Sequence, residues 1–568
     1  MPTLDWIGKK AVVNHHREVP YRLIHCDGEL SAGDADAGNL LVQGDNLEAL
    51  KALLPYYGGE VKCIYIDPPY NTGKADWTYN DKVNSPEIAA WLGRAVGKEA
   101  EDLCRHDKWL CMMYPRIRLL KDFLKKDGLL FVSCDDNEQA ALHLLLAEIF
   151  GRKNHVGTAI WKNATDNNPT QIAIEHEYVV VYAKDKDDLA RQWNGPENDT
   201  KDLMLEVFAQ IANEHSALKD RQKAFAEFIR KNAKSLGDLA RYKRVDERGV
   251  YVARRNLENP GKNGYQYEIE HPVTKKNCEK PLWGWRFPKD RMDDLLAEGR
   301  IIFGKDEKKI PELKAYLIDV GFPFRSVMNI DSRKGSNDIE AIFGRRDIFK
   351  NPKSVEFISY LLSFVSKSND IIMDSFAGSG TSGQAILEMN KQDGKNRRFI
   401  LIEMDKATSV EITAERLRRV ISGYAKGGDA SKPIEGLGSG FRYCHLGVPL
   451  FNEFGDLDLG VTFSDLAAHI FFSETGAPIP QKAKRDCPFI GTYKEKAVYL
   501  LFSAAEQGVA REAAGNVLTP DVLAQLPAVP PGFTGQRVVY GEGCTVSADR
   551  LKAESVIFKQ IPYQIESN

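Results

Sequence analysis

The tetrapeptide Asp67-Pro68-Pro69-Tyr70 places a carboxylate, two prolines and an aromatic ring directly after the apolar run at 61–66. The two prolines stiffen the backbone and remove two N–H donors, so the carbonyl oxygens stay available as hydrogen-bond acceptors. A rigid pair of acceptors beside a flat ring is suited to the exocyclic amino group of a planar base. A plain polar turn is the competing interpretation, but open α/β sheets place their sites in the loops that follow their strands.

A second segment, residues 374–381 (DSFAGSGT), predicts the end of a strand, a glycine turn and the start of a helix. Glycines let the backbone turn tightly and approach a ligand closely. The segment is not a phosphate-binding P-loop, because no lysine follows Gly380. Glu403 ends the next predicted strand, where a carboxylate can accept hydrogen bonds from both hydroxyls of a ribose. A solvated surface charge is the alternative for Glu403.

Short apolar runs alternate with helical patterns around both segments. Strands are predicted at 40–43, 61–67, 128–135, 177–184 and 397–405 and at the start of 370–380, with helices at 46–54, 115–126, 137–150, up to Met389, and 407–421. This alternation predicts the α/β class, with a parallel sheet covered on both faces. The pattern breaks after about residue 190, so we expect one sheet that is interrupted by an insertion.

The composition of the chain excludes several classes of protein. With 43% hydrophobic and 28% charged residues, the chain is typical of a globular protein and not of a disordered one. A net charge of −3 excludes a general polycation, so any nucleic-acid surface must be local. The nine cysteines form no C-x-x-C pair, which predicts reduced thiols in a cytoplasm. No sequence pattern predicts a membrane span or a metal site.

Positive charge becomes local in residues 241–289, which hold 12 basic and 6 acidic residues interleaved with tyrosines and tryptophans. Arginine and lysine bind phosphates and guanine edges, and aromatic rings stack or wedge between bases. A solvated face over a small aromatic core is the competing interpretation. The candidate contacts to nucleic acid are Arg254, Arg255, Lys275, Lys276 and Arg286.

The DPPY motif followed by a separate FAGSG motif resembles the S-adenosylmethionine-dependent DNA amino-methyltransferases, and the order of the two motifs resembles the circularly permuted β group. Residues 38–445 resemble the modification subunits of type III restriction-modification systems and their solitary relatives. Further matching segments are 44–48, 106–120, 127–136, 175–184 and 351–362. The resemblance implies a Rossmann-like methyltransferase sheet, an inserted target-recognition domain and a small C-terminal α/β module.

The implied domain boundaries follow from this resemblance. Residues 1–190 and 346–445 are expected to form the catalytic domain, 191–345 the target-recognition insertion, and 446–568 a module for interaction or oligomerisation.

The resemblance also implies roles for single residues. Asp67 and the carbonyl of Pro68 would accept hydrogen bonds from the target amine, within the stiff loop that Pro69 completes. Tyr70 would stack on a base flipped out of the duplex. The residues expected to contact S-adenosyl-L-methionine are Asp374 at its amino-acid part, Phe376, Gly378, Gly380 and Thr381 along the loop, Glu403 at the ribose and Asp45 at the adenine end.

The predicted function is methylation of adenine N6 in double-stranded DNA, because Asp rather than Ser precedes Pro-Pro-Tyr. Cytosine N4 is the alternative target. Methylation of an RNA base or a protein amide is a further alternative, against which the permuted motif order argues, and a non-catalytic DNA-recognition subunit is disfavoured by the intact motifs. The resemblance implies a homodimer or higher homo-oligomer, a bacterial cytoplasmic location at the nucleoid, and a separate helicase-nuclease restriction subunit as a candidate partner.

Overall fold

A ten-stranded sheet positions both motif segments, with the strand order β1-β16-β2-β13-β12-β3-β4-β6-β5-β11. The neighbouring strands from β16 to β4 are all parallel, whereas β1 pairs antiparallel with β16, and β6 pairs antiparallel with β4 and β5. The strands are β1 (Arg22–Gly33), β2 (Leu40–Gln43), β3 (Val61–Ile66), β4 (Leu124–Cys134), β5 (His155–Lys162), β6 (His176–Ala183), β11 (Val327–Asn329), β12 (Ile371–Asp374), β13 (Arg398–Glu403) and β16 (Gly440–Pro449).

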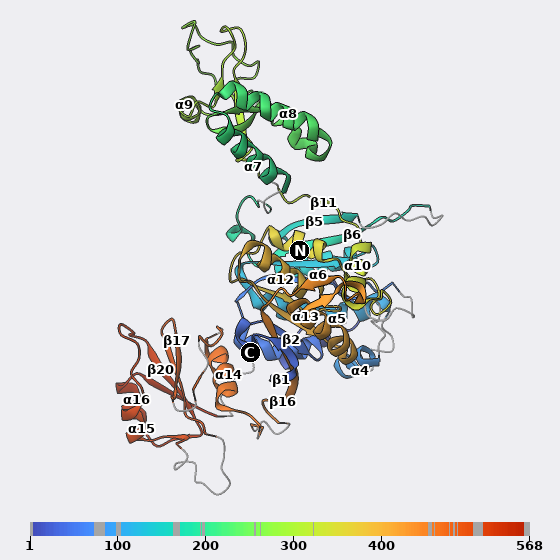
Figure 1. Cartoon of the computed structure of the whole chain (residues 1–568). Coiled ribbons are helices and arrows are strands. Elements are labelled where there is room, and N and C mark those ends of the chain that lie inside the picture. The colour runs from blue at the N-terminus through green and yellow to red at the C-terminus, as the bar shows by residue number, and fades with distance from the viewer. Residues whose placement is uncertain are drawn as a thin grey trace. The chain divides into compact units, whose positions relative to one another are not determined.

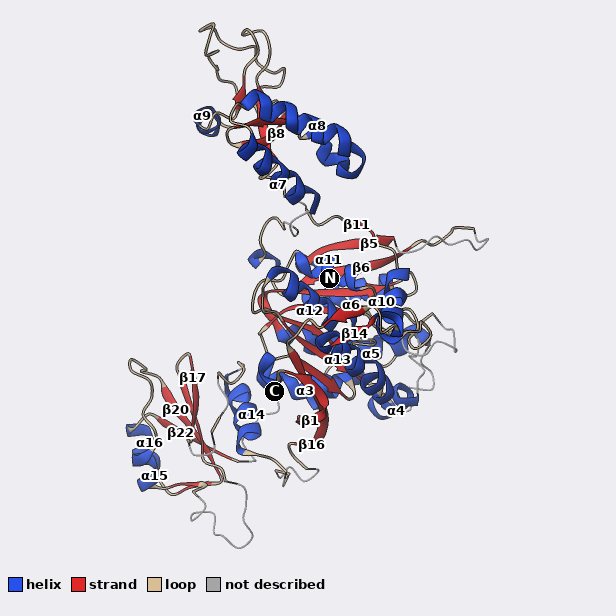
Figure 2. Cartoon of the chain, in the orientation of Figure 1, coloured by secondary structure: helices blue, strands red, loops and turns tan. Residues whose placement is uncertain are grey.

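Helices pack on both faces of this sheet (Figure 2). Every residue of β3 and of β12 is buried, as expected for parallel strands that are covered on two sides. The helices are α1 (Lys9–Val12), α2 (His15–Glu18), α3 (Asn46–Tyr57), α4 (Pro86–Ala95), α5 (Arg105–Phe123), α6 (Gln139–Phe150), α10 (Arg333–Phe343), α11 (Val355–Ser363), α12 (Thr381–Asp393) and α13 (Glu415–Ser422), with π-helical turns at Thr408–Ala414 before α13 and a small hairpin, β14 (Gly423–Ala425) and β15 (Pro433–Glu435), after it.

The direction of chain progression reverses between β12 and β3, which are neighbours in the sheet. From β12 the chain continues to β13 on one side, and from β3 it continues to β4 on the other side. Such a switch point opens a crevice at the carboxyl ends of the two strands, which is where open α/β sheets bind ligands. Asp67 follows β3 and Asp374 ends β12, so both motifs flank this crevice.

The computed structural model describes residues 4–72, 86–97, 104–162, 171–193, 195, 199–254, 257–261, 263–321, 323–452, 457–458, 460–475, 477–480, 483–484, 487–503 and 515–561. The chain forms two compact units (Figure 1). The first combines Met1–Arg191 with Arg325–Asn568, and the second is Gln192–Phe324. The sequence placed the end of the insertion at residue 345, but β11 and α10 belong to the first unit, because β11 pairs with β5.

The second unit has hydrophobic cores of its own. Phe225, Tyr242 and Leu317 belong to a buried cluster between its helices and its sheet, and Trp285 and Leu257 belong to a second cluster. Its elements are α7 (Asp199–Glu214), α8 (Leu218–Leu236), α9 (Lys289–Ala297) and the strands β7 (Arg244–Asp246), β8 (Gly249–Arg254), β10 (Glu312–Tyr316) and β9 (Ile301–Ile302), in that order in the sheet.

The C-terminal part of the first unit forms a separate four-stranded sheet, β17-β18-β20-β22, with apolar clusters on both faces. It is mixed, because β17 alone is antiparallel to its neighbour. Its elements are α14 (Phe463–Thr475), β17 (Phe489–Tyr493), β18 (Lys496–Leu500), β19 (Val517–Leu518), α15 (Pro520–Gln525), β20 (Gln536–Gly541), β21 (Gly543–Cys544), α16 (Ala548–Ala553) and β22 (Val556–Gln560).

Two expectations about the fold are wrong. The large sheet is mixed and not purely parallel, since β1 and β6 run against their neighbours. The cysteines are not all free, because the register of β1 and β16 places Cys26 opposite Cys444, and the two form a disulfide. None of the described helices combines the length and the apolar character that a membrane span requires.

Candidate active site

One narrow cavity at the switch point connects the two motifs. It is lined by Tyr65, Asp67, Phe349, Asn351, Lys353, Ile358, Asp374, Phe376, Ala377, Gly378, Ser379, Thr381 and Ser382. The structure therefore brings the predicted acceptor loop and the predicted glycine loop, about 300 residues apart, to the two walls of the same cavity.

Two residues of the acceptor loop (residues 67–70), Asp67 and Tyr70, form a hydrogen-bonded network with Glu177 and Lys353. The hydroxyl of Tyr70 is 2.8 Å from Asp67 Oδ1 and 2.7 Å from Glu177 Oε2. Lys353 Nζ donates to the Tyr70 hydroxyl at 2.8 Å and is 3.1 Å from Asp67 Oδ2 and 3.0 Å from Glu177 Oε2. These contacts fix the position of the Tyr70 hydroxyl and hold two carboxylates around one ammonium.

Burial and neighbouring charge act in opposite directions within this network. Burial raises the pKa of Asp67, the ammonium of Lys353 lowers it, and the charge of Glu177 raises it. For Lys353, burial alone would lower the pKa, but Asp67 and Glu177 raise it above its ordinary value. Lys353 is therefore a permanent cation in this network.

The two carbonyl groups of the proline pair have different surroundings. Trp109 on α5 is fully buried, and its Nε1 donates a hydrogen bond of 2.7 Å to the carbonyl of Pro69. In the described residues, no donor reaches the carbonyl of Pro68. The carbonyl of Pro68, which the sequence predicted as an acceptor for the target, is thus the one that is left available, and Trp109 anchors the loop through the other.

The loop after Tyr70 is closed by Asn71, whose φ of 61° lies in the left-handed region that Asn tolerates better than most residues. Asn71 is buried, and its amide donates to the carbonyl of Arg105 at 3.2 Å and to the carboxylate of Glu138. His106 Nδ1 contacts the same carboxylate at 2.7 Å. These side chains hold the far side of the acceptor loop.

The glycine loop is built on hydrogen bonds to Asp374. Its carboxylate accepts the N–H of Phe376 at 3.0 Å and the hydroxyl of Ser382 at 2.5 Å. Gly378 and Gly380 have φ values of 51° and 78°, so both occupy the left-handed region that favours glycine. This geometry explains the two glycines in the predicted motif.

The predicted cofactor residue Thr381 begins α12, and its hydroxyl donates to the backbone carbonyl of Lys353 at 3.0 Å. The buried guanidinium of Arg416 donates to the same hydroxyl at 2.9 Å. Thr381 therefore links the glycine loop to the segment that carries Lys353.

Two predicted cofactor contacts have other partners in the structure. Glu403 is 0% exposed, and its oxygens accept the backbone N–H groups of Gly378 at 2.8 Å and Asp405 at 2.9 Å. These two bonds hold the glycine loop, and the ribose contact expected of Glu403 stays a prediction. Asp45 caps α3 by accepting the N–H of Leu47 at 2.9 Å, and it pairs with Arg116 at 3.0 Å.

The neighbour of Asp45 does reach the glycine loop. Asn46 donates from its amide to the carbonyl of Ser375 at 3.3 Å, and the backbone N–H of Gly44 donates to the carbonyl of Glu403 at 3.0 Å. The segment before α3 therefore lies at the same edge of the sheet as the predicted cofactor loop.

The lining of the cavity fits a ligand that carries positive charge. Asp67 and Asp374 both line it, and both are buried. Burial raises the pKa of Asp374 to about 7, although the bonds from Ser382 and Phe376 lower it. The ammonium of Lys353 already pairs with Asp67, whereas no cationic side chain among the described residues pairs with Asp374. A cationic ligand would therefore compensate the cost of burying Asp374 as a charged group. The hydroxyl of Ser375 is buried without a hydrogen-bond partner among the described residues, so it retains bonding capacity beside Asp374.

Sequence reasoning assigned no role to Lys353 or Glu177. Glu177 is the second residue of β6 and lies at the same edge of the sheet as the carboxyl ends of β3 and β4, because β6 runs antiparallel to β4. Lys353 precedes Ser354, the N-cap of α11. Two sequence signals were available. Glu177 is a charged residue at the start of a mostly apolar strand, and Lys353 directly precedes a helix cap.

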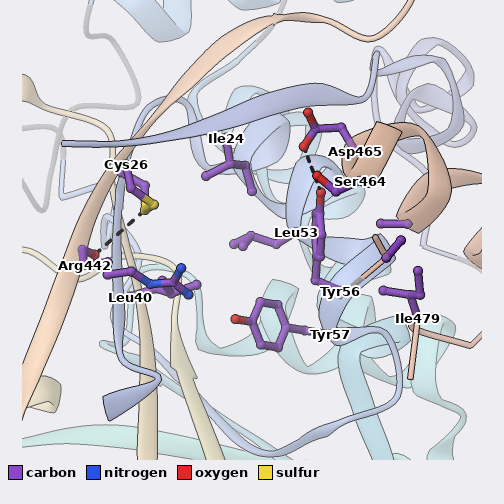
Figure 3. Close-up of a pocket in the computed structure, with 13 residues that line it drawn as sticks. Ile24, Cys26, Leu40, Leu53, Tyr56, Tyr57, Arg442, Ser464, Asp465 and Ile479 are labelled. Atoms are coloured by element: carbon purple, nitrogen blue, oxygen red, sulfur yellow. Dashed lines mark hydrogen bonds between the residues drawn. A yellow bond between two sulfur atoms is a disulfide. The ribbon is translucent and has the colours of Figure 1, made fainter. Parts of the chain in front are cut away.

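A second cavity, of about 420 Å³, lies between β1, β16, α3 and α14 (Figure 3). Its lining is mainly apolar, and Tyr56 donates to Asp465 at 3.5 Å within it. None of the predicted site residues lines this larger cavity. We therefore place the candidate site at the smaller one, where the carboxylates and the glycine loop converge.

The candidate DNA contacts lie in the second unit, and several are already paired there. Lys275 pairs with Glu270 at 3.3 Å and Lys276 with Glu307 at 3.6 Å. Such exposed pairs stabilise a protein by about 0–1 kcal/mol, so they do not prevent contact with phosphate.

The other candidates in the second unit are arginines. Arg254 donates to the hydroxyl of Tyr242 at 2.8 Å, and Arg286 is exposed. Arg255 lies outside the described residues.

In the described residues, no group of three or more His, Cys, Asp and Glu side chains is arranged to hold a metal ion.

Comparison with known proteins gives consistent results. The sequence model of the family described as "DNA methylase" matches residues 61–414. The EcoP15I Mod subunit, from the type III restriction-modification enzyme of Escherichia coli, is 38% identical over 72% of this chain and 65% of its own length. The StyLTI Mod subunit of Salmonella typhimurium is 29% identical over 83% of this chain and 70% of its own length. The chain thus spans about two thirds of the length of these relatives.

Solved structures also match. TTHA0409 from Thermus thermophilus is 13% identical, with a TM-score of 0.31, over 71% of this chain and 99% of that chain. The cytosine-N4-specific PvuII DNA methyltransferase is 10% identical, with a TM-score of 0.32, over 66% of this chain and 86% of that chain.

Proposed function

The chain belongs to the DNA methylase family, and on this basis we propose that it transfers a methyl group from S-adenosyl-L-methionine to adenine N6 in double-stranded DNA. The observation that carries the proposal is the shared cavity, which Asp67 lines from the end of β3 and the glycine loop at Gly378 lines from the end of β12. The relatives named as Mod subunits of type III restriction-modification enzymes support it.

The glycine loop and Asp374 would hold the cofactor. Asp374 would bind the ammonium of its amino-acid part, and Phe376, Gly378 and Thr381, which also line the cavity, would follow its length. When bound, S-adenosyl-L-methionine supplies a methyl group made electrophilic by a sulfonium sulfur. Glu403 contributes by keeping the loop in place through the N–H of Gly378.

The acceptor loop would bind the target amine. The lone pair of an adenine amine is delocalised into the ring, so the nitrogen is a poor nucleophile. Acceptors at Asp67 and at the carbonyl of Pro68 would bind its two hydrogens and favour a tetrahedral nitrogen with a localised lone pair. The ring of Tyr70, fixed by its hydroxyl contacts, would stack on the flipped base. Catalysis would rest on positioning and electrostatics.

Further parts of the proposal concern the partners and the location of the protein. Because these are Mod subunits, we propose that the chain works with a restriction subunit encoded as a separate chain, or acts alone as a solitary methyltransferase. A homodimer or higher homo-oligomer, a cytoplasmic location at the nucleoid, and DNA recognition by the second unit complete the proposal.

The test uses the purified full chain, labelled S-adenosyl-L-methionine and genomic DNA. Digestion of the product is expected to yield N6-methyladenine, with activity retained in EDTA, and mapping of methylated positions gives the recognition site. If the product is N4-methylcytosine, the target is cytosine and not adenine. If RNA or protein is methylated and DNA is not, the substrate assignment is overturned.

A further inference from the structure

The network of Asp67, Tyr70, Glu177 and Lys353 contains two carboxylates and one tyrosine hydroxyl between them. That hydroxyl carries a single hydrogen, yet its oxygen is 2.8 Å from Asp67 Oδ1 and 2.7 Å from Glu177 Oε2. With both carboxylates ionised, Tyr70 can donate to only one of them at a time. When one of the two carboxylates receives a proton, that carboxyl group can donate a hydrogen bond to the Tyr70 oxygen, while the Tyr70 hydroxyl donates to the other carboxylate. The contacts of Tyr70 with Asp67 and with Glu177 are then both hydrogen bonds.

Lys353 contacts all three other members of the network. Its ammonium donates to the Tyr70 oxygen at 2.8 Å and lies 3.1 Å from Asp67 and 3.0 Å from Glu177. Because the ammonium is about equally close to both carboxylates, Lys353 itself does not favour a transferred proton on one of them over the other.

The three ionisable side chains differ in their contact with solvent. The side chain of Lys353 is 9% exposed, that of Asp67 is 11% exposed, and that of Glu177 is 20% exposed. Asp67 also lines the cavity that would hold the target and the cofactor, so a bound base would cover it further. Glu177 is therefore the end of the network from which a proton reaches water most readily.

We propose that Asp67, Tyr70 and Glu177 form a proton relay that carries the proton released by the methylated amine from the buried site to Glu177, with Lys353 positioning the relay. The inference rests on the proposed function. The target nitrogen forms a bond to the methyl carbon, the electron pair of the broken C–S bond stays on sulfur, and the nitrogen loses one proton to Asp67. Asp67 then passes this proton to the Tyr70 oxygen while the hydroxyl hydrogen of Tyr70 moves to Glu177. Asp67 is again ionised, and Glu177 releases the proton to water.

Other titratable groups around the relay do not replace it. Burial raises the pKa of both Tyr65 and Cys134, so these two groups stay protonated at neutral pH. Asp374 has a raised pKa of about 7, mainly through burial, and its charge interacts with Asp67. A pH profile of one protein would therefore mix the titration of Asp374 with that of the relay, and the test must compare variants that all retain Asp374.

The test compares the parent with Glu177→Gln, which keeps the shape of the side chain but removes its capacity to hold a proton. Tyr70→Phe keeps the ring and removes the relay hydroxyl. The matched control is Glu175→Gln, two residues away on the chain, where the carboxylate pairs with Lys162 at 3.0 Å near the surface. Calorimetric affinity for S-adenosyl-L-methionine reports on folding and is expected to stay within about twofold of the parent for all variants.

Single-turnover methylation of DNA is measured from about pH 5.5 to pH 8.5. We expect Glu177→Gln and Tyr70→Phe to be slowed at least about 100-fold, as is typical for loss of a proton-transfer group, and Glu175→Gln to match the parent. The charge of Glu177 raises the pKa of Asp67, so its removal should also move the acid limb of the profile to lower pH. Acetate should partly restore the rate of Glu177→Ala and leave Glu175→Ala unchanged.

Two results overturn the inference but not the proposed function. The first is a parental rate for Glu177→Gln. The second is a slower rate for Glu177→Gln with an unmoved acid limb and no rescue of Glu177→Ala by acetate, which would make the role of Glu177 purely structural. A parent that methylates no DNA overturns the proposed function and this inference with it.

Discussion

Asp67 and Asp374 line one cavity from two neighbouring strands, yet we expect their loss to have different effects. Asp67→Ala is expected to slow methyl transfer at least about 100-fold, because it removes an acceptor that acts in the transition state. Its affinity for S-adenosyl-L-methionine in calorimetry should stay close to that of the parent. Asp127→Ala is the matched control, since it also removes a carboxylate that pairs with a lysine, Lys62, but away from the cavity. Transfer at the parental rate by Asp67→Ala would contradict the mechanism.

The raised pKa of Asp374 predicts that cofactor binding depends on pH. Burial raises this pKa to about 7, so the free carboxyl is mostly neutral at about pH 6 and mostly ionised at about pH 8. The cofactor ammonium binds the ionised form, and we therefore expect its Kd to rise about tenfold for each pH unit below 7. Calorimetry of the parent and of Asp374→Asn checks this, with weak binding and no such trend expected for the variant. A parental Kd that is constant across this range would exclude the assignment.

Residue types alone predicted the acceptor loop and the glycine loop, because the residues that define each loop follow one another in the sequence, at 67–70 and 374–381. They did not predict Lys353 and Glu177, since the partners of these side chains lie far along the chain and only the fold brings them together. They also did not predict that Glu403 accepts two backbone N–H groups, because contacts of the backbone cannot be deduced from residue types.

Among the structural elements, the turn between β12 and α12 gives the sharpest prediction. Gly378 in this turn and Gly394 at the other end of α12 have similar φ values, 51° and 65°. Gly378→Val and Gly394→Val should both destabilise the protein, by about 1–3 kcal/mol, through backbone strain. Only Gly378→Val should weaken cofactor binding in calorimetry, because Gly378 lines the cavity. Gly394 does not line it, and a side chain at Gly394 would extend into open space. Equal affinities for the two variants would mean that the turn serves only to pack the sheet.

The strands next to the motifs were predictable because they are continuous apolar runs, as β2 and β3 show. The strand β1 was missed, because its twelve residues are mostly exposed or half-buried and show no regular alternation. The direction of β6 was also missed, since a buried strand has the same composition whether it runs parallel or antiparallel to its neighbour.

For the whole molecule, the separate second unit predicts that target recognition can be changed without loss of cofactor binding. Alanine substitutions of the described basic residues in 241–289 should divide into two groups. Loss of a phosphate contact should weaken binding to all DNA and lower the salt slope by about one, whereas loss of a base contact should relax the recognised sequence at a cost of about 1–3 kcal/mol.

Salt-dependent binding assays and methylation mapping distinguish these groups. Lys126→Ala, which removes a surface lysine paired with Asp188 in the first unit, is the control. If every variant binds and methylates like the parent, the second unit does not read DNA, and the module after residue 446 is the next candidate.

The order of strands in the large sheet also bears on how the protein is made. β2 and β3 are close in sequence, but β13 and β12 lie between them in the sheet, and β2 has β16 on its other side. While the ribosome synthesises the chain at roughly 5–20 residues per second, β2 therefore waits some tens of seconds for both of its neighbours. During this interval an apolar strand lacks its sheet partners, and unpaired strands of this kind make folding intermediates prone to aggregation. The cavity between Asp67 and Asp374 can form only after residue 374 has left the exit tunnel, so polypeptides released before that point have no active site.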